Sequence, residues 1–311
     1  MKKILLAIVT SLMVAGCHNK KQIAITQIVN HPSLNEAKKG IIDHLDSQYE
    51  IIDQDAQGDI VIAQQIAKRL LSKKVALVVA ISTPSAQTFK NIPNPNKTPI
   101  LFSSVTYPKE VGLVENYGKP KGMSGVYDAP LIKEMLELSK KVIKDLKTIG
   151  VIYNPSESNS EQTVKELKKQ AQGINIKSIG ISNPTDIIAA VKTLASKVDM
   201  IYIPSDNTVW SALEILTETA KNYGIPVISS DPDSAKRGVS LALGYAQYDL
   251  GTTVAKQIKA ILEEGKSIED IPVQQPEEVR LYVNQPMLKK LNLTLPEKLP
   301  YSIRICGAEK C

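Results

Sequence analysis

Short apolar runs alternate with amphipathic stretches along most of the chain. The apolar runs are rich in β-branched residues and predict strands at 22–29, 75–81, 99–105, 148–153, 200–203, 226–229 and 280–283. Apolar positions at helical spacing predict helices at 34–45, 60–72, 131–144, 161–172, 184–195, 209–223 and 250–264. Because the strand runs are apolar at successive positions, they fit a parallel sheet covered by helices on both faces. The alternation therefore predicts an α/β fold.

The two halves of the chain repeat the same order of strands and polar loops. The corresponding segments are 30–35 with 154–159, 82–86 with 206–208, and 99–104 with 226–231. The second segment of each half follows the first at the same distance of 52 residues. Three correspondences in one order predict two similar α/β lobes. The segment 118–125, which contains Gly and Pro, is the expected crossing between them.

Ser, Thr, Asn and Asp crowd these repeated loops, which follow the carboxyl ends of the predicted strands. Ligands of parallel α/β sheets bind at that edge. Each such residue taken alone could equally cap the helix that follows it. Taken together, loops from two facing lobes would line a cleft, where helix N-termini suit a carboxylate and Asp206 or Asp231 suits an ammonium group. A zwitterion such as a free amino acid satisfies both requirements.

Composition narrows the class of protein. The chain has 311 residues, enough for about two domains of ordinary size. Its 43% hydrophobic fraction excludes a disordered chain, and its 16 Gly and 18 Pro are too scattered for a fibrous one. The longest uncharged apolar run, 4–16, is too short to cross a bilayer, which excludes a multi-pass membrane protein.

Catalytic and cofactor patterns are weak by comparison. The sequence contains no G-x-S-x-G or G-x-G-x-x-G motif and no cluster with metal-ligand spacing. Residues 265–267 (Gly-Lys-Ser) look like the end of a phosphate loop, but Ala260 stands where that motif needs Gly. An exported hydrolase is an alternative, but this hypothesis rests only on His31 near Glu36 and on several Ser residues. We therefore expect a binding protein rather than an enzyme, without a cofactor or a metal.

The first residues predict export. Two Lys residues precede the apolar stretch 4–14, which is the build of a secretory signal peptide. Residues 14–17 (Val-Ala-Gly-Cys) resemble the lipobox of bacterial lipoproteins, so we expect signal peptide 1–16 to be removed and Cys17 to be lipidated. The alternative is a secretory signal with an incidental Cys. Removal lowers the net charge from +6 to +4, which is too small and too dispersed to indicate nucleic acid.

Two cysteines, Cys306 and Cys311, remain once Cys17 is assigned to the lipid. In an oxidising compartment this pair can close a small disulfide loop, and the alternative is two free thiols. No His lies near them in the sequence to complete a zinc site.

Several motifs along the chain resemble those of one known family. They are 31–35 (His-Pro-Ser-Leu-Asn), 55–59, 83–87, 112–114, 150–160, 198–199 with 204–209, 248–251 and 270–273. The most distinctive is the string Asn-Pro-Ser-Glu-x-Asn-Ser at 154–160. On these motifs, which span nearly the whole mature chain, the sequence is similar to the lipoprotein substrate-binding proteins of ABC importers, in the group that includes tryptophan- and tyrosine-binding members.

The resemblance implies a type I periplasmic-binding-protein-like fold, in which two lobes with a parallel sheet each are joined by a hinge of three crossings. On that pattern the N-terminal lobe takes 22–124 with about 248–275, the C-terminal lobe takes 125–247 with about 276–295, and 296–311 form a tail. Carried over motif by motif, the ligand-binding residues are His31, Leu34, Thr83, Ser85, Asn154, Ser156, Glu157, Asn159, Asp206, Asn207 and Asp231. Ligand closes the lobes about the hinge, and the membrane permease recognises the closed form.

The ligand that the resemblance implies is an aromatic amino acid (tryptophan, tyrosine or phenylalanine), although a branched apolar amino acid would fit the same polar groups. Candidate rings for stacking are Tyr107, Tyr127, Tyr153 and Trp210, of which Tyr153 and Trp210 hold positions more typical of a core. Tyr107 stands where the family usually has Asp, which could remove a cleft carboxylate or add an aromatic wall.

The expected protein is thus a monomeric, lipid-anchored receptor outside the bacterial cytoplasm that delivers an amino acid to an ABC permease. The alternative is a sensory or adhesive surface lipoprotein that uses the same two lobes without a permease. Neither version performs chemistry on its ligand.

Overall fold

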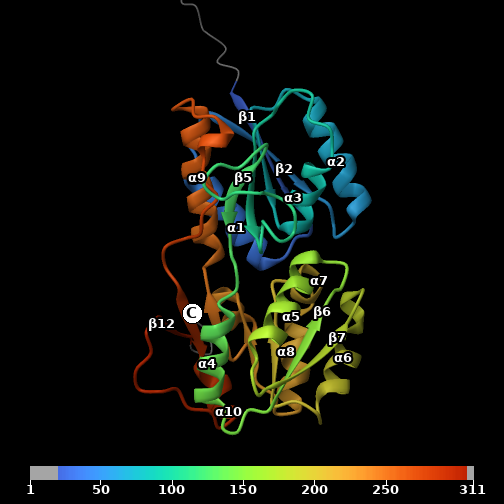
Figure 1. Ribbon diagram of the computed structural model, residues 1–311, viewed down its shortest axis with the longest axis vertical. Helices are drawn as coiled ribbons and strands as arrows, with labels where there is room; N and C mark the ends of the chain where they lie inside the picture. Colours follow the sequence, from blue (N-terminus) through green and yellow to red (C-terminus); the bar gives the residue numbers. More distant parts are fainter. Residues whose placement is uncertain (1–19, 307–311) are drawn as a thin grey trace, which may run out of the picture.

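Two separate sheets form the cores of two lobes in the computed structural model, which describes residues 20–306 (Figure 1). The N-terminal sheet has the order β2-β1-β3-β4-β5 and is parallel throughout. Its strands are β1 (Lys21–Gln27), β2 (Tyr49–Asp55), β3 (Leu77–Ile81), β4 (Ile100–Val105) and β5 (Ser124–Tyr127). Its helices are α1 (Pro32–Asp43), α2 (Ile60–Ser72), α3 (Thr83–Lys90) and α9 (Gln247–Leu262).

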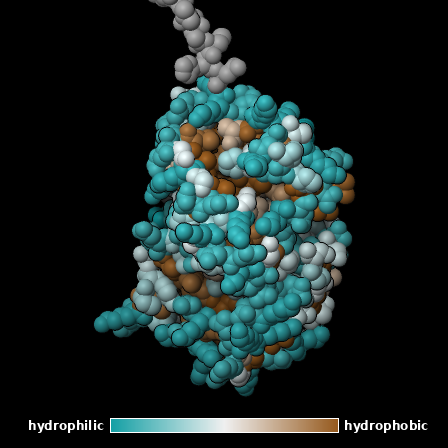
Figure 2. Space-filling view, turned by 45° about the horizontal axis from the view of Figure 1, so that its top comes forward, coloured by the Kyte–Doolittle hydropathy of each residue, from teal (hydrophilic) through white to brown (hydrophobic). Residues whose placement is uncertain are grey.

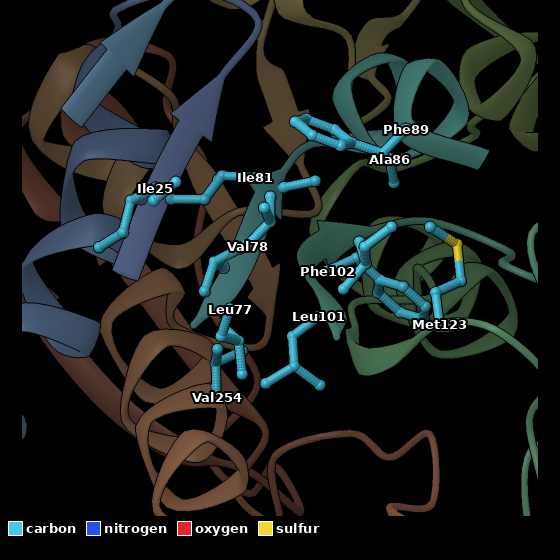
Figure 3. Packing of buried hydrophobic residues seen from close by; sticks show 14 of the residues in the cluster. Ile25, Leu77, Val78, Ile81, Ala86, Phe89, Leu101, Phe102, Met123 and Val254 are labelled. Carbon is cyan, nitrogen blue, oxygen red and sulfur yellow. The ribbon is translucent and has the colours of Figure 1, made fainter. Parts of the chain in front are cut away.

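Helices cover both faces of this sheet, α1 with α9 on one face and α2 with α3 on the other (Figure 1). The central strand β3 is buried along its whole length, as a strand covered on both faces must be. In Figure 3, Val254 of α9 lies beside Leu77 and Leu101 on one side of the sheet, while Ala86 and Phe89 of α3 lie on the other.

Two glycines bring α1 and α9 into backbone contact. A Cβ atom added to Gly251 of α9 would lie 2.0 Å from the carbonyl oxygen of Ala37, and one added to Gly40 of α1 would lie 2.2 Å from that of Tyr248. Any side chain at either position would therefore push the helices apart. The close contact fixes α9 relative to α1, although the two helices are far apart in the sequence.

The C-terminal sheet has the order β12-β11-β10-β9-β8-β6-β7 and is parallel except between β10 and β11. Its strands are β6 (Thr148–Tyr153), β7 (Asn175–Gly180), β8 (Met200–Ile203), β9 (Val227–Ser229), β10 (Leu241–Gly244), β11 (Arg280–Asn284) and β12 (Ser302–Cys306). The α-helices α4 (Ile132–Val142), α5 (Ser158–Gln170) and α10 (Gln285–Lys290) pack on one face, and α6 (Ile187–Leu194), α7 (Asn207–Trp210) and α8 (Leu213–Asn222) on the other. The 3₁₀ turns are η1 (Pro184–Asp186), η2 (Pro232–Arg237) and η3 (Ile268–Asp270).

All seven predicted strands are present, and the pattern missed five others, namely β2, β5, β7, β10 and β12. The edge strands β2 and β7 are partly exposed and carry polar residues, so they lack a continuous apolar run. The strands β5 and β10 have only four residues each. Two predicted helices are interrupted: the 184–195 helix begins with the turn η1, and the 209–223 helix is divided into α7 and α8.

Three crossings join the lobes, and the first lies later than the sequence indicated. We expected segment 118–125 to cross, with a boundary at 124, but β5 pairs with β4 and belongs to the N-terminal sheet. The chain therefore crosses after Tyr127, at 128–131, before α4. The second crossing leads from β10 into α9, and the third leads from Gln274, which pairs with β5, into β11.

The segment 296–311, expected to be a tail, contributes to the C-terminal sheet. Residues 302–306 form β12, which pairs in parallel with β11. Cys306 at its end is buried and disulfide-bonded. Cys311, Cys17 and the expected signal peptide 1–16 lie outside the described residues.

Hydrophilic residues cover most of the face shown in Figure 2, with hydrophobic residues visible between them in several smaller areas. Between residues 20 and 306, the structure contains no helix with both the length and the apolar character required to span a bilayer.

Candidate functional site

A small cavity of about 30 Å³ lies between the lobes, where the carboxyl ends of the strands of both sheets face each other. The N-terminal lobe lines it with His31, Ser33, Leu34, Ser82, Thr83 and Ser104. The C-terminal lobe contributes Asn159, Ser205, Asp206, Asn207, Trp210 and Asp231, and the crossings contribute Asp128 and Gln247.

Helix N-termini form the wall on the N-terminal lobe. His31 is the N-cap of α1 and accepts from the Leu34 N–H at Nδ1, 3.5 Å away. Ser82 is the N-cap of α3 and accepts from the Ser85 N–H over 3.4 Å. The φ of Ser82 is +89°, a region that residues other than glycine rarely adopt, so the turn at this cavity wall is strained. The positive ends of the α1 and α3 dipoles thus lie at the cavity, where they favour an anion.

Two aspartates on the C-terminal wall differ in how their oxygens are used. Both oxygens of Asp206 are occupied, since Oδ2 accepts from the Asn154 N–H at 2.6 Å and Oδ1 accepts from the Val209 N–H at 3.0 Å. Asp231 Oδ1 accepts from the Asp233 N–H at 2.9 Å, whereas Oδ2 is buried and has no hydrogen-bond partner among the described residues. Of the two carboxylates considered for an ammonium group, Asp231 is therefore the one with an oxygen to offer.

Burial and the nearby Asp233 carboxylate together raise the pKa of Asp231 to about 7. A cation held against Asp231 would stabilise its ionised form and lower this pKa. Asn159, also on the C-terminal wall, has a buried Oδ1 without a hydrogen-bond partner among residues 20–306. The wall thus offers two unused acceptors, which suit a ligand that donates hydrogen bonds.

A chain of hydrogen bonds ties the first two crossings to the end of β4. Ser104 donates to Gln247 Oε1 at 2.6 Å, and Gln247 Nε2 donates to Asp128 Oδ2 at 3.3 Å. Thr106 donates to Asp128 Oδ1 at 2.8 Å. Burial raises the pKa of Asp128 to about 6. The hinge therefore adds a third carboxylate to the cavity, beside those of Asp206 and Asp231.

Two rings and one aliphatic side chain make the apolar part of the cavity. Trp210 and His31 are stacked, with ring centroids 6.5 Å apart and an interplanar angle of 25°. The Trp210 indole N–H donates to the carbonyl oxygen of Pro204 at 2.7 Å, which fixes the ring. Leu34 lines the cavity beside them. Of the four candidate rings only Trp210 lines this cavity; Tyr107, Tyr127 and Tyr153 do not.

The lobes contact each other directly across the cleft. His31 Nε2 of the N-terminal lobe lies 3.3 Å from Asn207 Oδ1 of the C-terminal lobe. Gln87 Nε2 donates to Ser158 Oγ at 2.9 Å, again from one lobe to the other. The two lobes are therefore closed on the cavity.

The structure brings seven of the eleven predicted ligand-binding residues to the cavity. They are His31, Leu34, Thr83, Asn159, Asp206, Asn207 and Asp231. The remaining four lie elsewhere: Ser85 faces a smaller cavity inside the N-terminal lobe, and Ser156 is exposed. Asn154 donates to Thr208 Oγ1, and Glu157 accepts from Asn207 and Thr208.

The sequence patterns did not assign Ser33, Ser82, Ser104, Asp128, Ser205 and Gln247 to the site, and they named Trp210 only as a candidate ring that is more typical of a core. Ser33, Ser82, Ser104 and Ser205 belong to or adjoin the repeated polar segments, so the repeat could have indicated them. Asp128 and Gln247 lie in crossings and carry no comparable signal. Among the described residues, no three or more His, Cys, Asp or Glu side chains are grouped so that they could hold a metal ion.

The model of the ABC transporter substrate binding protein family matches residues 22–303, almost the whole described chain. The chain belongs to this family. Its members are solute-binding proteins rather than enzymes, and those of ABC importers work outside the cytoplasm.

Three relatives illustrate the similarity. A tyrosine-binding protein of Clostridioides difficile is 38% identical over 284 residues, which cover 88% of this chain and 81% of that protein. The structure of an ABC domain in complex with L-Trp from Streptococcus pneumoniae has a TM-score of 0.84 at 29% identity, covering 89% of this chain and 96% of that one. The ligand-free, open structure of a Clostridium difficile substrate-binding protein with adhesive properties has a TM-score of 0.68 at 34% identity, covering 92% and 99%.

The two structural comparisons differ more in TM-score than their sequence identities would lead one to expect. The L-Trp complex superimposes better although its sequence is less similar, and the structure with the lower TM-score is the one described as ligand-free and open. This agrees with the direct contacts between the lobes of the present chain. The fold is the two-lobed type I arrangement, which also extends to a leucine-binding protein of Thermotoga maritima at 16% identity and a TM-score of 0.60.

Proposed function

We propose that the cleft binds an aromatic amino acid and that the chain delivers it to an ABC permease. The observation that carries the proposal is a closed cavity with a buried, unpartnered carboxylate oxygen on Asp231 and an indole ring on Trp210. The names of the relatives support it, since one is a tyrosine-binding protein and another is in complex with L-Trp.

The charges around the cavity indicate the orientation in which the ligand would bind. Its ammonium group would lie toward Asp231 and Asp128, where carboxylates are concentrated. Its carboxylate would lie toward the N-termini of α1 and α3, whose dipoles and hydroxyl groups favour an anion. Its side chain would contact Trp210, His31 and Leu34, which favours an aromatic or large apolar group.

The proposed cellular location rests on residues 1–17 of the sequence. We infer that the signal peptide 1–16 directs export and that a lipid on Cys17 holds the protein, as a monomer, at the outer side of the membrane. Labelling with a radioactive or alkyne-bearing fatty acid tests this anchor: Cys17→Ser should abolish the label.

A thermal-shift panel tests the ligand class. Residues 18–311 contain every described residue, and we expect L-tryptophan, L-tyrosine or L-phenylalanine to raise their melting temperature. At a ligand concentration a hundredfold above Kd, the stabilisation is about 2.7 kcal/mol. A larger shift with leucine or isoleucine would replace the aromatic ligand by a branched one, and no shift with any amino acid would overturn the proposal. Mass spectrometry of a co-purified ligand gives an independent answer.

Affinity should depend on pH because of Asp231. Its pKa of about 7 means that the carboxyl becomes increasingly protonated below pH 7, and pairing with an ammonium group then requires that proton to leave. The ligand's own charges stay constant between about pH 5 and 7. We therefore expect Kd, measured by calorimetry, to rise as pH falls below 7, by up to about tenfold per pH unit. A Kd that is constant from pH 8 to pH 5 would contradict the pairing.

A further inference from the structure

The helix α7 carries two cavity-lining side chains, Asn207 and Trp210, although it has only four residues. A single helical turn leaves its first N–H groups without partners inside the helix and is not stable alone. Its position in the cleft must therefore be set by groups outside it. One is Asp206, the N-cap, which accepts from the Val209 N–H at 3.0 Å.

The second group is Glu157, which directly precedes the neighbouring helix α5. Its Oε2 accepts from the Asn207 N–H at 3.1 Å and from Asn207 Nδ2 at 2.6 Å. Its Oε1 accepts from the Thr208 N–H at 3.0 Å and from Thr208 Oγ1 at 3.1 Å. Glu157 is the N-cap of α5, yet its side chain makes no capping bond to that helix. Both oxygens of Glu157 thus accept from residues of α7. Glu157 itself does not line the cavity.

The bond between Glu157 and the Asn207 side chain fixes which way the Asn207 amide faces. Because Nδ2 donates to Glu157, Oδ1 is turned to the other side, where His31 Nε2 lies 3.3 Å away in the opposite lobe. His31 Nδ1 accepts from the Leu34 N–H, so the proton of the neutral ring is on Nε2 and is donated to Asn207. Burial favours this neutral ring and lowers the pKa of His31 to about 4.

Donors and acceptors therefore follow one direction from α1 of the N-terminal lobe to α5 of the C-terminal lobe. Leu34 donates to His31, His31 donates to Asn207, and Asn207 donates to Glu157. We propose that Glu157 is a positioning residue for ligand binding, which orients the Asn207 amide so that it accepts the hydrogen bond closing the two lobes. The inference rests on the proposed function, because it concerns closure of the same cleft.

A carboxylate can accept all four bonds, whereas a carboxamide can accept on one side only. In Glu157→Gln the new NH₂ group would face donors of Asn207 or Thr208. Relief of that conflict by rotation of the Asn207 amide would turn Nδ2 toward the His31 Nε2–H and break the bond between the lobes. The change keeps the size of the side chain, so the variant should still fold.

The experiment measures binding of L-tyrosine to residues 18–311 by calorimetry, together with the fluorescence of Trp210, the only Trp of the chain. Glu157→Gln should weaken binding by up to about tenfold, the effect of losing the one hydrogen bond between the neutral His31 ring and Asn207. It should also reduce the change in Trp210 emission on saturation, since the His31 ring no longer closes on the indole. Glu161→Gln is the matched control, because Glu161 lies on the same helix and pairs only with the exposed Lys165.

A double-mutant cycle separates positioning from a general effect on the fold. In an Asn207→Leu background the amide is absent, so Glu157→Gln should change Kd less than twofold. An equal loss in both backgrounds, or a Kd and emission of Glu157→Gln equal to those of the unchanged protein, would overturn the inference while leaving the proposed function intact. Failure of the unchanged protein to bind any amino acid would instead overturn both.

Discussion

Replacing Asp231 by Asn is expected to weaken amino-acid binding by about 2–5 kcal/mol, or roughly 30-fold to several thousandfold in Kd. The substitution keeps the size of the side chain and the oxygen that accepts from the Asp233 N–H. It replaces Oδ2, which is buried and has no partner among the described residues, by an uncharged NH₂ group that donates hydrogen bonds. The ligand ammonium would then be desolvated without an opposite charge beside it, which is the costly case.

Calorimetry at pH 8 measures this loss, because Asp231 is then ionised in the unchanged protein. Asp233→Asn is the control: it removes a carboxylate two residues away that pairs with Lys236 and does not line the cavity. It should leave Kd at pH 8 nearly unchanged. Below pH 7 it should strengthen binding slightly, since the Asp233 charge raises the pKa of Asp231. Equal affinities of Asp231→Asn and the unchanged protein would remove Asp231 from the ligand site.

Gly251→Ala should destabilise the protein by about 1–3 kcal/mol, the usual range for overpacking. The new methyl group would lie 2.0 Å from the Ala37 carbonyl oxygen and 2.8 Å from the Ile41 amide nitrogen, so α9 and α1 must separate. Helix propensity acts in the opposite direction, because Ala is favoured over Gly inside a helix by about 1 kcal/mol. The sign of the change in the free energy of unfolding therefore shows whether overpacking or helix propensity has the larger effect.

Urea denaturation gives the free energy of unfolding for this comparison. Gly118→Ala is the matched control, since an added Cβ there meets only the Asn116 side chain at 3.5 Å. We expect that variant to be within about 0.5 kcal/mol of the unchanged protein. A stabilised Gly251→Ala would mean that the helices do not pack backbone to backbone. Because α9 begins at Gln247, the destabilised variant should also bind ligand more weakly.

The strands predicted from the sequence are those whose burial is visible in their own residues. The central strand β3 is apolar throughout, because helices cover both its faces. The edge strand β2 has the sequence YEIIDQD, in which partial exposure allows Glu50 and Asp53. Its identity as a strand comes from pairing with β1, and pairing between distant segments leaves no mark in a local pattern.

The residues of the site also fall into those that a local sequence pattern indicates and those that it does not. His31 and Asp231 follow strands directly, so the repeated loops placed them at the correct edge of each sheet. Asp128 lies at the cavity because β5 pairs with β4 and moves the first crossing past Tyr127, and Gln247 lies there because the second crossing ends at the start of α9. The repeat also indicated Glu157, but the direction of its side chain depends on α7, which lies 50 residues later in the chain. Loop composition therefore predicted positions near the site better than it predicted contacts within it.

Each lobe is completed by a segment that follows the other lobe in the chain. The helix α9, at Gln247–Leu262, covers part of the N-terminal sheet, and β12, at Ser302–Cys306, is the outermost strand of the C-terminal sheet. During synthesis, neither lobe can bury its whole core until these late segments have emerged from the ribosome. The chain therefore remains incompletely folded through most of its translation. An incompletely folded polypeptide can still pass through a membrane channel.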